Sequence, residues 1–246
     1  MTLNIRTVHR YLAYIIGLQV FLWLLGGVAF AWIPFQSLVK GGAVLAEQEP
    51  TALPDGWWRQ LDTLPANLAP QGEVSISESA QGALLFFRAE DERHWLRLAD
   101  GSIDSSPSVD EVDAFASSLY AGTGELVSVE RIQSPDAQIF GLVHELYGRE
   151  DVWQARFDDA SGTRFYFDGA TGRYLTVRNH FWVVYDALWR LHIMDYRGGE
   201  DFNNWLLSVF SVSALLFALS GALLGIQRLS RRYGKRRSGS SAKAQA

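Results

Sequence analysis

The sequence WLLSVFSVSALLFALSGALLGI, residues 205–226, runs for 22 residues without a charged side chain. A second uncharged run, YLAYIIGLQVFLWLLGGVAFAWI, covers the 23 residues 11–33. The hydrocarbon core of a bilayer is about 30 Å thick, and an α-helix needs roughly 20 apolar residues to cross it. The two runs therefore predict a membrane protein with two transmembrane helices, 11–33 and 205–226, and one large domain between them.

The charged residues are distributed unevenly along the chain. All 27 Asp and Glu lie between Glu47 and Asp201, and residues 34–204 hold 13 Lys and Arg, so this region carries a formal charge of −14. The whole chain carries only −5, because both flanks are basic. Lys and Arg next to membrane spans tend to stay in the cytoplasm. We therefore expect cytoplasmic termini, 1–10 and 227–246, on a bacterial inner-membrane protein whose acidic domain is periplasmic.

The strongest basic cluster follows the second span directly. We expect it to face the bilayer, because a basic residue beside anionic lipid contributes about 1 kcal/mol of binding. Its position next to the membrane disfavours a role in nucleic-acid binding. The basic residues assigned to lipid contact are Arg228, Arg231, Arg232, Lys235, Arg236 and Arg237.

The chain contains no cysteine. A domain outside the cytoplasm must then be held by its hydrophobic core rather than by disulfides, and about 170 residues are enough for such a core. The composition also excludes iron–sulfur clusters, Cys-ligated zinc and covalently attached c-type haem.

The first apolar run has a signal peptide as its alternative interpretation. Residues 1–10 resemble a positively charged leader, and Ala29-Phe30-Ala31 resembles a cleavage site. The apolar run is longer than the usual 7–15 residues of a signal peptide and continues through Trp32 and Ile33. These features favour a retained transmembrane helix.

The region between the spans predicts an α+β domain over 56–178, after a linker over 34–55. Ser108 and Glu111 match a capping box at the start of a helix that continues to about residue 120. Alternating or apolar runs predict strands, and a helix followed by an antiparallel meander favours a sheet with the helix on one face. The expected strands are 74–79, 83–88, 94–98, 126–132, 152–157, 164–167 and 174–177.

The sequence VWQARFDDASGTRFYFDGATGRYL, residues 152–175, resembles the signature of the PepSY domain. It has a strand, a polar turn, a second strand that ends in Asp168, and a turn containing Thr171-Gly172. The flanks resemble PepSY-associated transmembrane proteins, with His9-Arg10 before the first span and Leu191-His192 ahead of the second.

The resemblance implies a periplasmic PepSY-like domain, a sheet plus a helix, on a membrane anchor. It also implies two lines of function. Relatives with more spans are associated with ferric-siderophore reduction and hold haem b through membrane histidines. Isolated PepSY domains are associated with inhibition or regulation of proteases. This chain has only two clear spans, which separates it from the larger relatives.

Histidines are the weak candidates for holding haem, namely His192, His180 and His9. The predicted topology puts His9 and His192 at opposite ends of spans, about 30 Å apart, so the two cannot ligate one iron. A helix joining His180 to His192 would separate them by about 18 Å. A single-histidine site, a re-entrant segment or a dimer would avoid both constraints.

Residues 179–196 predict an amphipathic helix that lies at the membrane interface or packs within the protein, with docking of a partner's membrane helix as the alternative. Small residues spaced by four in each span, Ala13 with Gly17 and Gly221 with Gly225, are typical of close helix packing. The sequence shows no phosphate-binding loop, nucleophile elbow or His-Glu-x-x-His motif.

Taken together, these features favour a non-catalytic accessory subunit. We expect it to support transmembrane electron transfer or the reduction of iron chelates, with a membrane-protein partner or as a homodimer. A haem-binding ferric reductase subunit and a periplasmic regulatory module for a protease or sensor are the alternatives.

Overall fold

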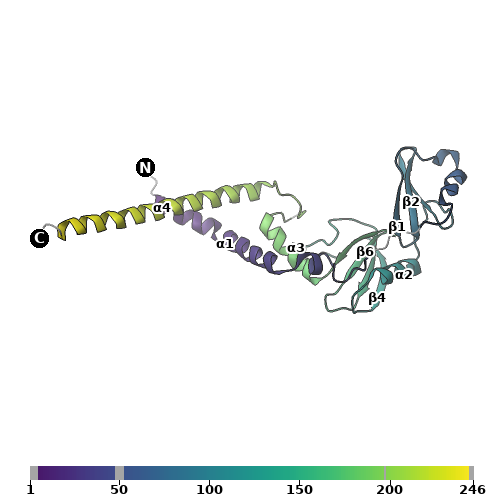
Figure 1. The fold of residues 1–246 in the computed structure, drawn as a ribbon, viewed down its shortest axis with the longest axis horizontal. Helices are drawn as coiled ribbons and strands as arrows, with labels where there is room; N and C mark the ends of the chain where they lie inside the picture. Colours follow the sequence, from purple (N-terminus) through teal and green to yellow (C-terminus); the bar gives the residue numbers. More distant parts are fainter. Residues whose placement is uncertain (1–4, 48–52, 197, 244–246) are drawn as a thin grey trace. The chain divides into compact units, whose positions relative to one another are not determined.

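The computed structural model describes residues 5–47, 53–196 and 198–243, with side chains up to Ser230. The fold is α+β, with two antiparallel sheets and two long apolar helices (Figure 1). The chain divides into two compact units. One unit contains the N-terminal residues up to Ala31 and the residues from Leu188 onward, and the other runs from Trp32 to Ala187.

Two helices are long and apolar enough to cross a membrane. Helix α1, Ile5–Trp32, has 28 residues and a mean hydropathy of 2.0 in its most apolar window. Helix α4, Trp205–Lys243, contains a 26-residue candidate span, Trp205–Ser230, with a mean hydropathy of 2.2. Asn204 caps α4, because its Oδ1 accepts a hydrogen bond from the backbone N–H of Leu207 at 2.8 Å.

The first sheet is a three-stranded meander in the order β1-β2-β3. Its strands are β1 (Ser75–Ser79), β2 (Gly82–Ala89) and β3 (Glu92–Arg97), close to the ranges predicted from the sequence. Two short 3₁₀ segments, Trp57–Thr63 and Ala66–Leu68, supply apolar side chains to one face of this sheet. The sequence pattern did not predict these segments. Their core contains Leu85, Phe87, Leu96 and Leu98, with Trp57, Leu61, Leu64 and Leu68 packed against it.

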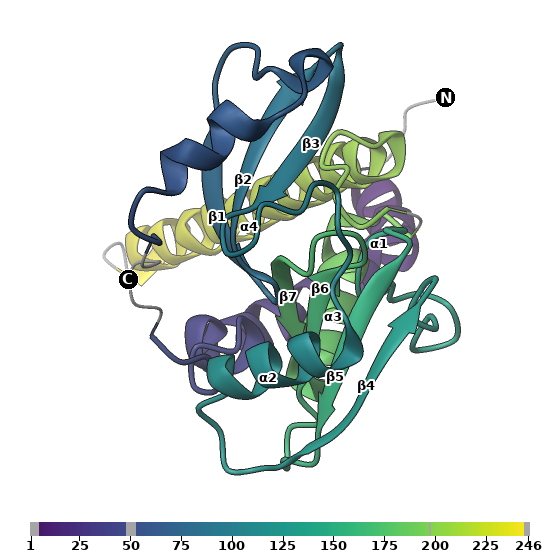
Figure 2. The same cartoon turned by 90° about the vertical axis from the view of Figure 1, so that its right-hand side faces the viewer.

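The second sheet is a four-stranded meander in the order β4-β5-β6-β7, and helix α2 (Val109–Leu119) covers one of its faces (Figure 2). The strands are β4 (Leu126–Ile132), β5 (Val152–Phe157), β6 (Arg164–Asp168) and β7 (Tyr174–Arg178). This arrangement confirms the predicted helix on an antiparallel sheet.

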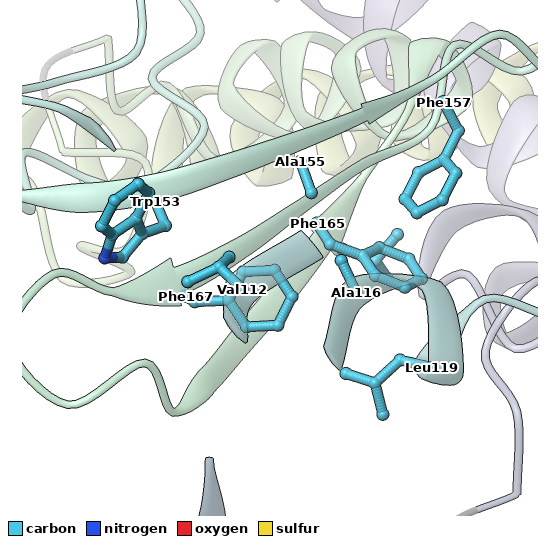
Figure 3. Packing of buried hydrophobic residues seen from close by; sticks show 9 residues of the cluster. Val112, Ala116, Leu119, Trp153, Ala155, Phe157, Phe165 and Phe167 are labelled. Carbon is cyan, nitrogen blue, oxygen red and sulfur yellow. The ribbon is translucent and has the colours of Figure 1, made fainter. Parts of the chain in front are cut away.

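The core between α2 and the second sheet is built from alternate residues of the strands. Figure 3 shows the side chains of α2 facing aromatic rings from β5 and β6. Phe165 and Phe167 point to this core, while Tyr166 between them points to the opposite face. The core residues shown and labelled are Val112, Ala116, Leu119, Trp153, Ala155, Phe157, Phe165 and Phe167.

The predicted capping box is present at the start of α2. The Ser108 side chain accepts a hydrogen bond from the Glu111 N–H, and the Glu111 carboxylate accepts one from the Ser108 N–H at 2.8 Å. The two residues therefore satisfy two backbone donors that the helix leaves free.

The segment predicted as a linker over 34–55 is partly structured. A π-helical turn, Phe35–Val39, buries Val39 completely, and the backbone of Val44 and Ala46 bonds to residues at the end of α2. Apolar side chains of this segment pack into or against the hydrophobic cores. The composition of the segment alone did not predict this packing.

The turn after β6 joins the two sheets. The Asp168 carboxylate accepts hydrogen bonds from the Thr171 N–H and hydroxyl, each at 2.9 Å. Gly172 has φ of +69°, and an added Cβ would lie 2.8 Å from Cβ of Ala80 in the first sheet's β1–β2 turn. The Ala80 N–H donates to the Gly172 carbonyl at 3.0 Å. A glycine is therefore required at this position by both conformation and space.

The loop between β5 and β6 is organised by one carboxylate. Asp159 accepts hydrogen bonds from the Ser161 and Thr163 N–H groups, from the Thr163 hydroxyl and from the Tyr120 hydroxyl. Burial tends to raise the pKa of Asp159, but the hydrogen bonds outweigh burial and hold that pKa below its ordinary value. The ionised form is therefore favoured in the folded state.

Asp159→Asn is expected to lower stability at neutral pH by about 1–3 kcal/mol, because the loop loses charge-assisted hydrogen bonds. A depressed folded-state pKa gives stability above the unfolded pKa that is lost as pH falls through the folded pKa. The difference in melting temperature between wild type and variant should therefore be largest at pH 7 and shrink below about pH 3. The exposed Asp136→Asn is the matched control, and a difference that stays constant with pH contradicts the assignment.

Candidate functional site

A buried carboxylate lies on the face of the second sheet opposite α2. Glu145 is 1% exposed and lies in the connection between β4 and β5. Its Oε1 is 2.6 Å from Nη2 of Arg164, and its Oε2 is 3.1 Å from Nε of the same guanidinium. This is a two-point ion pair of the kind that fixes geometry as well as charge.

Two further side chains complete this group. The Tyr166 hydroxyl donates to Oε2 of Glu145 at 2.5 Å and accepts from the Gln154 amide at 2.6 Å. Arg178 donates through Nε to the Glu145 carbonyl at 2.8 Å, and its guanidinium lies 4.1 Å from the ring centroid of Trp182. The contact with Trp182 is a cation–π interaction.

The strand register explains why these residues meet. Gln154 is directly opposite Tyr166 on β5 and β6, and Arg164 is directly opposite Arg178 on β6 and β7. Burial, reinforced by the Glu145 carboxylate, raises the pKa of Tyr166 well above its ordinary value. Burial lowers the pKa of Arg178. The tyrosine therefore stays a protonated donor at neutral pH, and the group ties the 138–147 segment to the sheet.

A second set of polar contacts lies within the other unit, which contains α1 and the end of helix α3 (His180–Ile193). Gln19 is 7% exposed, and its amide donates to the Leu191 carbonyl at 2.8 Å. The Trp23 indole N–H donates to the His192 carbonyl at 2.8 Å. Both acceptors lie in the last turn of α3, where helix carbonyls lack intrahelical partners.

His9 joins α1 to α4. Its Nδ1 is 2.8 Å from the Ser220 hydroxyl oxygen, and its ring stacks on Phe217 with centroids 4.4 Å apart. Gly221 gives this ring its space, since an added Cβ would lie 3.1 Å from Cε1 of His9.

His192 lies in an aromatic environment. Its ring centroid is 6.0 Å from Trp23, 5.9 Å from Phe30 and 6.3 Å from Trp189, whose ring plane is nearly parallel to the imidazole. Nδ1 of His192 is buried and has no hydrogen-bond partner among the described residues. An added Cβ at Gly26 would lie 3.9 Å from that nitrogen.

Neither His9 nor His180 can share one iron with His192 within one copy of the chain. His192 lies beside Gly26, which is 17 residues after His9 on α1, or about 25 Å along the axis. His180 lies 12 residues before His192 on α3, or about 18 Å. His9 is also engaged by Ser220. This leaves His192 as the candidate for a one-sided ligand among these three histidines.

Helix α3 buries charged side chains and leaves part of its apolar face exposed. Asp186, Arg190 and Trp182 are 3%, 0% and 4% exposed, whereas Phe181 and Val184 are 41% and 50% exposed. The charged side chains of Asp186 and Arg190 can be buried because each has an interaction partner within the protein. The Tyr147 hydroxyl, for example, lies 3.3 Å from a carboxylate oxygen of Asp186. The exposed apolar face remains available for lipid, and the interfacial role stays a prediction.

The small residues and basic residues are placed unevenly. The expected close packing was assigned to Ala13, Gly17, Gly221 and Gly225. A Cβ added at Gly221 would lie within 4 Å of another described side chain, whereas a Cβ added at Gly17 or Gly225 would not.

Arg228 is exposed on α4. The remaining side chains of the proposed lipid-facing tail lie outside the described part of the chain, namely Arg231, Arg232, Lys235, Arg236 and Arg237.

Sequence reasoning missed Glu145 and Ser220 as contact residues. Glu145 could have been noticed as an acidic residue between the apolar Val143 and Leu146, a pattern that indicates a buried carboxylate in need of a basic partner. Ser220 also bonds its own helix at the Phe217 carbonyl, so its second contact, with His9, has no local signal.

Comparison with known proteins gave no match: no protein-family profile, no curated protein and no solved structure is significantly similar to this chain.

Glu145→Gln should lower the melting temperature by roughly 10 °C, because breaking a buried ion pair costs about 3–5 kcal/mol and leaves the Arg164 charge uncompensated. Thermal unfolding of the full chain in mild detergent measures the change. Glu130→Gln, on the exposed side of β4, is the matched control and should leave the melting temperature unchanged. Equal effects from the two substitutions would contradict the assigned role of Glu145.

His9→Ala and Ser220→Ala should show a coupling energy of about 0.6 kcal/mol, and at most about 1.7, in a double-mutant cycle of unfolding in detergent. Ser213 is the control, because among the described residues its hydroxyl donates only to the Val209 carbonyl of its own helix. His9→Ala combined with Ser213→Ala should be additive. Additivity of the His9 and Ser220 substitutions would mean that this contact does not join the helices.

Proposed function

We propose that this chain is a membrane-anchored PepSY-like accessory subunit that supports transmembrane electron transfer or the reduction of iron chelates. It has no catalytic centre of its own in this proposal. Its domain faces the periplasm, and both termini face the cytoplasm of a bacterial inner membrane. A membrane-protein partner, or a second copy of the chain, completes the functional assembly.

The observation that carries the proposal is the turn Asp168–Gly172 in its structural context. This turn follows β6, the third strand of the meander packed on α2, and the whole domain lies in sequence between the two candidate spans. The same order of helix, strands and Asp-x-x-Thr-Gly turn is what the sequence shares with PepSY proteins. A short turn of this kind is a weak signal alone and gains weight from its position.

The contacts of α1 support a retained first helix. Gln19 and Trp23 donate to the end of α3, and His9 contacts Ser220 on α4. If α1 were removed as a signal peptide, the Ser220 hydroxyl and the two carbonyls at the end of α3 would lose these hydrogen bonds. Polar side chains aimed at specific acceptors on other helices are typical of membrane helices that pack with one another.

An accessory role is favoured by the way the described polar groups are used. The buried Glu145 is bonded to Arg164 and Tyr166, and Asp159 is committed to backbone donors of its own loop. General acid–base or nucleophilic catalysis needs such groups to face a substrate with a suitable pKa. Here they hold loops and sheets in place, which suits a domain that positions a partner.

The haem-bearing alternative rests on His192, whose Nδ1 is buried without a partner among the described residues. One such nitrogen suits a single axial ligand, and the other face of the iron would need a group from another chain or an open position.

Expression in a bacterial host with ample haem, followed by affinity purification in mild detergent, tests both versions. The proposal predicts co-purification of a redox membrane protein and no Soret absorbance from the chain alone. It also predicts that deletion of the gene slows iron-chelate reduction by cells, with rescue by the full chain and not by the two spans joined without residues 56–178. A stoichiometric Soret band would replace the accessory role with haem binding. Unchanged iron reduction together with altered turnover by a protease would favour a regulatory module.

A further inference from the structure

A cavity of about 600 Å³ opens beside the first sheet, where it meets the turn that follows β6. Metabolite-sized ligands occupy pockets of about 300–1,000 Å³. The lining includes three arginines, Arg88, Arg93 and Arg173, with a single carboxylate, Glu73, and the ring of Phe86. The lining thus carries a formal surplus of two positive charges.

Two of these arginines are direct neighbours across strands. Arg88 on β2 is opposite Arg93 on β3, so their side chains leave the same face of the sheet. Like charges directly opposite in a sheet are destabilising. Neither guanidinium has an ion pair or a side-chain hydrogen bond with any described residue. The repulsion is therefore left in place by the protein itself.

The same chain shows how it compensates such a pair elsewhere. Arg164 and Arg178 are also directly opposite each other, on β6 and β7. There the carboxylate of Glu145 binds Arg164, and the carbonyl of Glu145 accepts from Arg178. Glu145 thus bonds to both members of that arginine pair, to one of them through its carboxylate, and Arg88 with Arg93 has no equivalent among the described residues.

Arg173 reaches the cavity because of the turn that joins the two sheets. Gly172 packs against Ala80, and the next residue, Arg173, places its guanidinium 5.8 Å from the ring centroid of Phe86. Phe86 and Arg88 are two residues apart on β2 and so share one face of the strand. The turn thereby adds a third arginine and an aromatic surface to the pair on the sheet.

We propose that this cavity, lined by Arg88, Arg93, Arg173 and Phe86, binds a small organic anion that carries at least two carboxylate or phosphate groups. Arginine forks bind such groups through paired N–H donors, and their surplus charge calls for more than one anionic group. Phe86 offers an apolar surface to the body of the ligand. This site does not depend on the function proposed above and adds a ligand to the domain.

The surrounding charge favours a small ligand over an anionic polymer or membrane. Residues 34–204 carry a formal charge of −14, and Glu90 and Asp91 form the turn next to Arg88 and Arg93. Screening limits exposed charges to a range of about 8 Å at physiological salt. A small anion inside the cavity senses the arginines, whereas an extended polyanion would also meet the acidic surface around them.

Calorimetric titration of the full chain in mild detergent tests this site with citrate, phthalate and pyrophosphate as probes. Acetate and benzoate, which carry one charge each, serve as ligand controls. We expect at least one of the three multivalent probes to bind, about tenfold or more tightly than the single-charge controls, with affinity that falls as salt rises. Arg88→Gln with Arg93→Gln, and separately Arg173→Gln, should each weaken that binding about tenfold or more. Arg156→Gln, an exposed arginine on β5, should leave it unchanged.

The melting temperature without ligand separates binding from a structural role. Removal of the uncompensated charges at Arg88 and Arg93 should leave it unchanged or raise it. Absence of binding by all three probes at about 5 mM, or equal loss with Arg156→Gln, would overturn the proposal. Binding that is unaffected by both arginine substitutions would overturn it as well.

Discussion

The interior of a bilayer offers no hydrogen-bond partners, so a helix that carries polar side chains into it must find acceptors and donors on other protein segments. Helix α1 obeys this constraint at three levels. His9 contacts Ser220 of α4, and Gln19 and Trp23 donate to carbonyls at the end of α3. If α1 lies in a membrane, these contacts fix which of its faces meets protein and which meets lipid.

Buried polar groups in the domain between the candidate spans also need hydrogen-bond partners within the protein. The Glu145 carboxylate is stable at 1% exposure because Arg164 and Tyr166 bond to it, and Arg178 bonds to the backbone carbonyl of the same residue. The Asp168 turn depends equally on internal donors, and its Gly172 allows the two sheets to approach. Hydrogen bonds to polar side chains thus fix the positions of these loops. In the arginine cavity, by contrast, Arg88 and Arg93 have no side-chain partner among the described residues.

Local signals were sufficient for the strands and for α2, but not for the short helical segments before β1 or for the contacts between elements. Ser108 and Glu111 are three residues apart, and the strands alternate over five to eight residues, so one-dimensional patterns predicted them. Residues distant in sequence, such as His9 and Ser220, meet only after the fold forms. The exposed face of α3 also depended on buried partners for Asp186 and Arg190, which helical periodicity cannot report. The arginine cavity depends on the register of β2 with β3 and on the close approach of Gly172 to Ala80. Neither feature can be predicted from one segment of the sequence.

The central claim is that both apolar helices cross a membrane and leave the domain on the opposite side from the termini. The chain has no cysteine, so single substitutions provide unique labelling positions. Ser134→Cys in the domain and Ser241→Cys in the C-terminal tail, probed with a membrane-impermeant maleimide on intact spheroplasts, test the claim directly. The account predicts labelling of the domain cysteine in intact spheroplasts and labelling of the tail cysteine only after lysis. Labelling of the tail before lysis, or protection of the domain until lysis, would contradict it.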